Sequence, residues 1–293
     1  MRDFAASRKR EPTRPRARFP DFFVIGAMRA GTTSASGYLR QHPEVYLPAQ
    51  KELHYFDRDT NFDRGKEWYA GLFRAAGEAR AVGEATPWYL YAPQAPARMA
   101  ELVPGARLIA ILRNPVDRAY SHYWHDRHRG RISFPFDEGV AREREEISSP
   151  GSGVSTRNSY LDRGFYLAQL ERVCAHFHRE ALLVLLFDDL VNDTRTAYRS
   201  MCRHLRIDDS FEPRNLGRNL SPPGPPRSDR LHRFTRAHRH TFSGRVVARL
   251  NAGKPATYPL MEPALRADLV AYFAPQNRAL AAWLGRDLSA WLV

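Results

Sequence analysis

The stretch Phe22–Thr33, which reads FFVIGAMRAGTT, decides the fold. Its first four residues form a short apolar, β-rich run, which predicts a buried strand. Gly26 and Gly31 follow with four residues between them, and the hydroxyl-rich sequence from Thr32 predicts a helix that ends before Pro43. A glycine loop between a strand and a helix favours phosphate binding, because the loop N–H groups and the helix N-terminus point at the anion.

Later parts of the chain repeat this alternation. The apolar runs Leu108–Leu112 and Leu182–Phe187 predict two more buried strands. Helices are predicted to begin at Pro115 and at Thr194, and the second, amphipathic helix reaches Leu205. Alternating strands and helices are typical of an α/β fold, here a P-loop-like parallel β-sheet flanked by helices on both faces.

Two polar segments, 129–158 and the proline-rich 212–230, are predicted to be long loops. Loops of this length in a compact domain are usually lids or binding loops. The segment Glu262–Leu284 has the apolar spacing of a helix, with Pro275 marking a break in it.

The chain has 293 residues, of which 43% are hydrophobic, so it is long and apolar enough to form a packed globular body. The first twenty residues hold seven basic side chains without apolar periodicity, which predicts a basic disordered tail over 1–20 and a single domain over 21–293. The longest apolar run, Ala181–Phe187, is too short to cross a bilayer, and no secretion signal follows the basic N-terminus. We therefore expect a cytoplasmic protein without a membrane span. Cys174 and Cys202 lack metal-ligand spacing, and we expect them to be reduced thiols.

The charge of the chain indicates an anionic partner. Its 45 Lys and Arg residues against 32 Asp and Glu residues give a formal net charge of +13 at pH 7. Nucleic acid, an acidic membrane and a phosphate- or sulfate-bearing ligand all satisfy that charge. A basic nucleic-acid-binding protein stays open as an alternative, but the tail holds much of the charge and no nucleic-acid-binding motif is visible in the rest, so we expect no specific nucleic-acid partner.

The glycine loop lacks two parts that a nucleoside-triphosphate enzyme needs. In the pattern G-x-x-x-x-G-K-[ST] a lysine follows the second glycine, whereas Thr32 follows Gly31 here. The predicted strand Leu108–Leu112 ends in Arg113 instead of an aspartate for magnesium. A P-loop small-molecule kinase is therefore the weaker enzyme hypothesis, and an ordinary tight turn is the plain structural alternative.

Arg113 and Ser121 form a second candidate anion site. The arginine lies at the end of a predicted strand and the serine on the first turns of the next predicted helix. A guanidinium offers a planar fork of donors for phosphate, and a hydroxyl adds one more donor. The alternative is that Arg113 pairs with a helix aspartate and that Ser121 is a surface residue.

The segment Lys51–Asp57, which reads KELHYFD, holds a candidate acid/base pair. If the backbone is extended there, Glu52 and His54 project from the same side. A carboxylate held by burial and by an imidazole is suited to deprotonating a hydroxyl. A surface ion pair is the alternative interpretation.

Together these elements resemble the family of sulfotransferases that use 3′-phosphoadenosine 5′-phosphosulfate (PAPS), in particular the heparan sulfate sulfotransferases and their bacterial homologues. The matching stretches cover nearly all of the predicted domain and are PDFFVIGAMRAGTT from Pro20, KELHYFD from Lys51, GEATPWYL from Gly83, ILRNPVDRAYSHY from Ile111, YFAPQNRAL from Tyr272 and LGRDL from Leu284. The resemblance implies transfer of a sulfuryl group from PAPS to an acceptor hydroxyl, or to an amine, with 3′-phosphoadenosine 5′-phosphate (PAP) as product and no metal. It implies a small-molecule or glycan acceptor, and it leaves the oligomeric state open.

The resemblance also assigns roles to residues of this chain. Glu52 matches the family's catalytic base and His54 a residue that assists it, while Arg113 and Ser121 match the 3′-phosphate site. The residues matched to binding of the 5′-phosphosulfate are Gly26, Arg29, Ala30, Gly31, Thr32 and Thr33.

Two positions depart from the family pattern. Family members usually carry lysine where Arg29 stands, so a guanidinium is expected to act on the transferring group here. Some members carry a second lysine where this chain has Ala85. Arg227, in the proline-rich loop, is expected to contribute to a flap over the donor.

Overall fold

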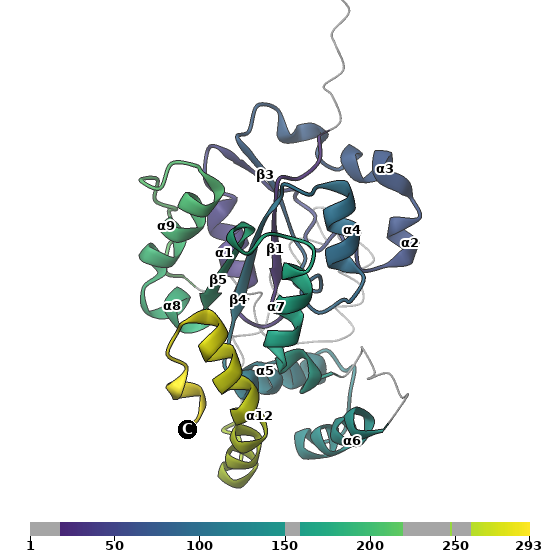
Figure 1. Ribbon diagram of the computed structural model, residues 1–293, viewed down its shortest axis with the longest axis vertical. Helices are drawn as coiled ribbons and strands as arrows, with labels where there is room; N and C mark the ends of the chain where they lie inside the picture. Colours follow the sequence, from purple (N-terminus) through teal and green to yellow (C-terminus); the bar gives the residue numbers. More distant parts are fainter. Residues whose placement is uncertain (1–17, 150–158, 219–246, 248–258) are drawn as a thin grey trace, which may run out of the picture.

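Strand β1 (Phe22–Gly26) lies in the middle of a five-stranded parallel sheet with the order β2-β3-β1-β4-β5 (Figure 1). The computed structural model describes residues 18–149, 159–218, 247 and 259–293. The other strands are β2 (Val45–Tyr46), β3 (Ala81–Ala85), β4 (Arg107–Leu112) and β5 (Leu182–Leu186). The predicted α/β class is confirmed.

Helices cover the sheet on both sides, with α8 and α9 at the left of the view and α3 and α4 at the right (Figure 1). The α-helices that follow β1 in the described residues are α1 (Thr32–Leu39), α2 (Asp59–Phe62), α3 (Gly65–Gly71), α4 (Ala95–Leu102), α5 (Pro115–His128), α6 (Phe136–Ser148), α7 (Tyr166–Cys174), α8 (Phe187–Asn192), α9 (Thr194–Leu205) and α12 (Pro263–Leu284). Short 3-10 helices lie at Arg74–Ala76, Asp162–Gly164, Arg179–Ala181 and Ser289–Trp291.

The sheet is buried, as strands covered by helices on both faces must be. All five residues of β1 and all five of β3 are buried. Strand β3 escapes prediction because its sequence, AVGEA, is short and contains a glycine and a glutamate. The glycine is required, since a Cβ on Gly83 would lie 2.1 Å from Cζ of Phe22 in the neighbouring strand.

One predicted boundary is wrong in detail. The predicted strand Leu182–Phe187 is one residue too long, because β5 ends at Leu186 and Phe187 begins α8. The carboxylate of Asp189 accepts the N–H of Leu186 over 3.3 Å, which caps the helix start and ends the strand. Helix α1 ends at Leu39, before Pro43 as predicted.

Two predictions of irregular structure are also wrong. Residues 129–158 were predicted to be a loop, yet Phe136–Ser148 within them forms α6, which buries Phe136 and Val140 against α5 and α12. Pro275 was predicted to break the last helix, but α12 runs through it without interruption. Proline removes a single N–H donor, and the packing of α12 against α5 and α7 offsets that loss.

The N-terminal tail prediction falls mostly outside the described residues. The structure describes the last three residues of the predicted tail, 18–20. Arg18 donates to the carbonyl of Ala79 over 2.6 Å, and Phe19 packs against the core. Cys174 and Cys202 are both free thiols. Across the described part of the chain, no helix is long and apolar enough to span a membrane.

Candidate active site

The sheet topology creates the site. Strand β1 pairs with β3 on one side and with β4 on the other. Strands β2 and β3 lie on one side of β1 and strands β4 and β5 on the other, so the strand order reverses at β1. Ligands of open parallel sheets bind at such a reversal, beyond the carboxyl ends of the strands. The glycine loop follows β1 and Arg113 follows β4, and both therefore lie at this edge.

The loop between β1 and α1 has a shape that only glycine permits at its two ends. A Cβ on Gly26 would lie 2.6 Å from Cβ of Leu90. Gly31 has a φ of 87°, and a Cβ there would lie 2.9 Å from Cδ2 of Leu190. Helix α1 follows directly, and the N–H groups of its first two residues, Thr32 and Thr33, have no acceptor within the helix. The loop and the helix start together form a cradle for an anion.

Arg29 joins the loop to α5. Its Nε donates to Oγ of Ser121 over 3.1 Å, and its Nη1 lies 3.2 Å from Nδ1 of His125, one turn further along the helix. Because a guanidinium only donates, Nδ1 of His125 accepts. Burial, followed by the charge of Arg29, lowers the pKa of His125 to about 3, so its ring is neutral.

Arg113 completes this side of the site. Its Nη1 donates to the carbonyl of Arg29 over 3.3 Å, and its guanidinium lies 4.7 Å above the ring of Phe187. Burial lowers the pKa of Arg113, yet it stays a cation at neutral pH. The structure thus brings together Arg29, Arg113 and Ser121, which lie far apart in sequence.

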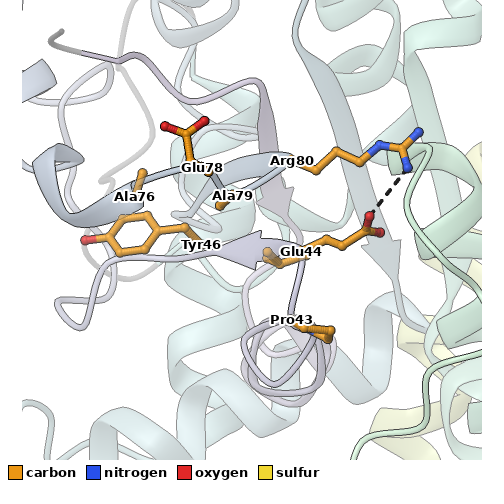
Figure 2. A pocket seen from close by; sticks show the side chains of 8 residues that line it. Pro43, Glu44, Tyr46, Ala76, Glu78, Ala79 and Arg80 are labelled. Atoms are coloured by element: carbon orange, nitrogen blue, oxygen red, sulfur yellow. Dashed lines mark hydrogen bonds and ion pairs between the residues drawn. The ribbon is translucent and has the colours of Figure 1, made fainter. Parts of the chain in front are cut away.

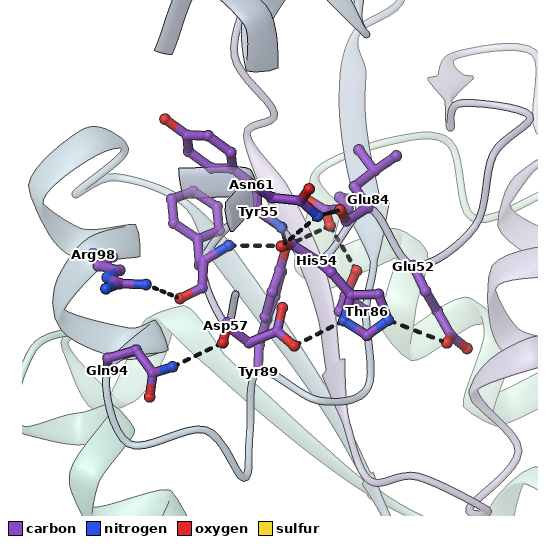
Figure 3. A network of polar contacts seen from close by, with 12 residues as sticks. Glu52, His54, Tyr55, Asp57, Asn61, Glu84, Thr86, Tyr89, Gln94 and Arg98 are labelled. Atoms are coloured by element: carbon purple, nitrogen blue, oxygen red, sulfur yellow. Dashed lines mark hydrogen bonds and ion pairs between the residues drawn. The ribbon is translucent and has the colours of Figure 1, made fainter. Parts of the chain in front are cut away.

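The acid/base pair lies on the segment that follows β2, and Figure 3 shows its geometry. Nε2 of His54 lies 3.7 Å from Oε2 of Glu52, and Nδ1 of His54 lies 2.8 Å from Oδ2 of Asp57. The backbone there does not meet the condition of being extended, because Glu52 and His54 both have a φ of 54°. The two side chains meet through these left-handed turns instead of through strand alternation.

The three side chains differ in exposure and in charge. The side chains of His54 and Asp57 are 9% and 4% exposed, whereas that of Glu52 is 43% exposed and faces solvent. The interaction with the nearby His54 ring lowers the pKa of Glu52 against the opposing effect of burial. Burial opposes the charged form of His54, but its bonds to Asp57 and Glu52 outweigh that effect and raise its pKa. Glu52 is therefore an accessible carboxylate at neutral pH, which suits a base.

A buried network holds this turn in place (Figure 3). The hydroxyl of Tyr89 accepts the N–H of Tyr55 over 3.0 Å and donates to Oε1 of Glu84 over 2.6 Å. Asn61 donates to the carbonyls of Leu53 and His54, over 3.0 Å in each case. Residues 53–55 are thus fixed from two sides.

Three contact residues of the site lack an assigned role in the sequence analysis: Lys51, Asp57 and His125. His125 was detectable in principle, since it lies four residues after Ser121 on one helix face. Lys51 and Asp57 stand inside the KELHYFD stretch, but no spacing rule connects them to their partners. Arg227 lies outside the described residues, and its predicted role remains untested.

Two cations of the site suit an anionic ligand. Lys51 and Arg113 are both half-buried, and neither has an ion pair with a carboxylate among the residues that the structure describes. Partly desolvated cations without a carboxylate favour binding of phosphate or sulfate. Within the same residues there is no cluster of three or more His, Cys, Asp or Glu side chains that could hold a metal ion.

A hollow lies away from the candidate active site, at the sheet edge formed by β2. Its volume is about 480 Å³. Figure 2 shows Glu44 and Arg80 next to each other in its lining, where they form an ion pair with an N–O distance of 3.4 Å. It contains none of the predicted site residues. Its lining is Pro43, Glu44, Val45, Tyr46, Ala76, Glu78, Ala79 and Arg80.

A parallel α/β sheet with a glycine cradle, half-buried cations and an accessible carboxylate is typical of enzymes that transfer a group from a phosphate-bearing donor. Comparison with known proteins identifies which ones. Residues 19–218 match the family described as "Sulfotransferase domain". The chain belongs to this sulfotransferase family and is a transferase, as the sequence predicted.

Solved and curated relatives agree with this assignment. A crystal structure of a sulfotransferase from Alicyclobacillus acidocaldarius is similar with a TM-score of 0.72 and 32% identity, covering 94% of this chain and 99% of that one. The heparan sulfate glucosamine 3-O-sulfotransferase 6 of Mus musculus is 39% identical over 179 residues, which are 61% of this chain and 49% of the relative. The bifunctional heparan sulfate N-deacetylase/N-sulfotransferase 4 of Mus musculus is 28% identical over 286 residues, 93% of this chain. This chain spans 31% of that relative's length.

Proposed function

We propose that this sulfotransferase moves the sulfuryl group of PAPS to an acceptor hydroxyl by in-line displacement, with Glu52 as general base. The observation that carries the proposal is the meeting of Arg29, Arg113 and Ser121 beside the glycine cradle. One end of the donor, the 5′-phosphosulfate, fits the cradle and Arg29. The other phosphate, at the 3′ position, fits Arg113 and Ser121.

In the proposed reaction no covalent bond forms between the protein and the sulfuryl group. As the acceptor oxygen bonds to sulfur, the bond from sulfur to the 5′-phosphate oxygen breaks, and Glu52 takes the acceptor proton. Arg29 and the N–H groups at the start of α1 neutralise the charge that grows on the leaving phosphate. His54 holds the Glu52 carboxylate, and Asp57 holds the His54 ring.

For the acceptor we propose an anionic glycan, with a hydroxyl-bearing small molecule as the second candidate. Two relatives of this chain are named for heparan sulfate, one for N-sulfation and one for 3-O-sulfation. The cationic surroundings of Glu52 favour an acidic acceptor. His54 has the largest effect in lowering the pKa of Glu52, and the charges of Lys51 and, more weakly, Arg129 lower it further, whereas burial raises it.

Transfer of a radiolabelled sulfuryl group tests this proposal. Purified protein is incubated with ³⁵S-labelled PAPS and, separately, desulfated heparan sulfate, N-acetylated heparosan, chondroitin and a simple aryl alcohol. We expect label in a glycan hydroxyl without added metal. Label only in free amines of the glycan would contradict the O-transfer proposal, and absence of transfer together with absence of PAP binding would contradict the donor.

Thermal shift separates the two remaining alternatives. A ligand that binds the folded state at about 100 times its Kd stabilises that state by about 2.7 kcal/mol. We expect PAP to raise the melting temperature. A rise with ATP and magnesium but not with PAP would favour the kinase hypothesis, and a rise with duplex DNA alone would favour nucleic-acid binding.

A further inference from the structure

The ammonium of Lys51 lies against the start of α1. Nζ of Lys51 donates to Oγ1 of Thr33 over 2.9 Å, and Thr33 stands in the first helical turn after the glycine loop. Lys51 is half-buried, and its burial lowers its pKa, with the charge of Glu52 acting in the opposite direction. Its hydrogen-bond partner is a neutral hydroxyl and not a carboxylate, so the ammonium places a positive charge beside the anion cradle.

The sheet fixes Lys51 in this place. The N–H of the next residue, Glu52, donates to the carbonyl of Ala85 over 3.2 Å, and Ala85 is the last residue of β3. Strand β3 pairs with β1, whose end leads into the glycine loop. The segment that carries Lys51 is therefore anchored one strand away from the cradle.

The consecutive residues Lys51 and Glu52 thus contact two different parts of the site. Lys51 contacts the helix start that follows the cradle, and Glu52 contacts His54. The position at which a sulfuryl group would pass from a donor in the cradle to an acceptor beside Glu52 lies between them. A cation at that position stabilises charge on the sulfuryl oxygens without transferring a proton.

We propose that Lys51 is a further catalytic residue, whose ammonium binds the transferring sulfuryl group on the side of Thr33. The proposal rests on the proposed function and adds a residue to it. Lys51 acts by charge alone: no bond to it forms or breaks, and it keeps its protons. Its role is distinct from that of Arg29, which reaches the site from the loop and contacts α5.

The test compares Lys51→Met, which keeps the length of the side chain and removes its charge, with Lys51→Arg, which keeps the charge. Lys66→Met is the matched control, because Lys66 is exposed on α3. Steady-state transfer from ³⁵S-PAPS gives kcat, calorimetry gives the Kd of PAP, and the pH profile of kcat/KM reports the base. PAP binding shows in the same samples that the cradle is folded.

We expect Lys51→Met to lower kcat about 100-fold, the size of effect seen when one stabilising donor is removed from a transition state. PAP affinity should change less than threefold, because PAP lacks the sulfuryl group. Lys51→Arg should recover at least tenfold of the lost rate. The acidic limb of the Lys51→Met profile should move to higher pH, since the charge of Lys51 contributes to the lowered pKa of Glu52.

Three results would overturn the proposal. The first is a kcat of Lys51→Met within threefold of that of Lys66→Met. The second is an equal loss of PAP affinity and of kcat/KM, which would place the ammonium on a phosphate. The third is a rate for Lys51→Arg as low as that for Lys51→Met. By contrast, a wild-type protein that transfers no label would contradict the proposed function itself.

Discussion

Replacing Tyr89 with Phe removes one hydroxyl that links the buried Glu84 to the turn carrying the proposed base. Tyr55 loses the acceptor of its N–H, and Glu84 loses one of its donors. Both groups are buried, and an unsatisfied buried group costs about 1–3 kcal/mol. Glu84 retains its bonds from Thr86 and Tyr69, so its share of the loss is at the low end of that range.

The expected loss of unfolding free energy is therefore about 2–4 kcal/mol. At roughly 2–4 °C per kcal/mol for a chain of this size, the melting temperature should fall by about 5–15 °C. Denaturant unfolding measures the first quantity and calorimetry the second. Transfer measured well below the melting temperature should fall about tenfold or more, because a loosened turn misplaces Glu52 and His54.

Tyr69→Phe is the matched control for this prediction. The hydroxyl of Tyr69 also donates to Glu84, through the other carboxylate oxygen, but no hydrogen bond connects it to the turn among the described contacts. Tyr69→Phe should lose stability and keep its single-turnover rate. Equal rates for the two variants, or a stability loss below about 0.5 kcal/mol for Tyr89→Phe, would refute the reasoning that the network positions the base.

Three further substitutions probe the site. Glu52→Gln keeps the size and hydrogen bonding of the side chain but removes its basicity, so kcat should fall about 10²- to 10⁴-fold in steady-state assays while PAP affinity by calorimetry stays unchanged; a near-normal rate would move the base elsewhere. The base works only when ionised, and its bond to His54 is the largest cause of its lowered pKa, so His54→Ala should shift the acidic limb of the kcat/KM profile to higher pH; an unshifted limb would argue against the pair. Arg29→Ala should lower kcat more than it raises the donor KM, with partial recovery in Arg29→Lys, and a single-turnover rate within threefold of wild type would remove Arg29 from the transition state.

Strands β1, β4 and β5 and the glycine loop were predictable because their signals are local. Apolar runs bounded by glycine or proline mark β1 and β4, and Pro115 marks the start of α5. Helix α6 was not predictable in the same way, because it buries Phe136 and Val140 in a cluster shared with residues far along the chain. Polar composition alone favoured a loop there, and tertiary packing decided otherwise.

The site shows the same division. The sequence predicted that Glu52 and His54 belong together on the condition of an extended backbone. The left-handed backbone that brings them together was not predictable, because positive φ values at non-glycine residues follow from surrounding contacts and not from residue type. It could not predict that Arg29 contacts His125 and that Lys51 contacts Thr33. Both contacts join segments that only the order of the strands brings together.

The central claim is that the site holds a nucleotide with a 3′-phosphate, and a double titration tests it most directly. Calorimetry gives the Kd of PAP and of adenosine 5′-phosphate for the wild type and for Arg113→Ala. A charge-assisted contact in a dry site contributes about 2–5 kcal/mol, so the wild type should bind PAP roughly 30- to 4000-fold more tightly than adenosine 5′-phosphate. Arg113→Ala should lose most of that difference, whereas equal affinities of the wild type for the two nucleotides would contradict the account.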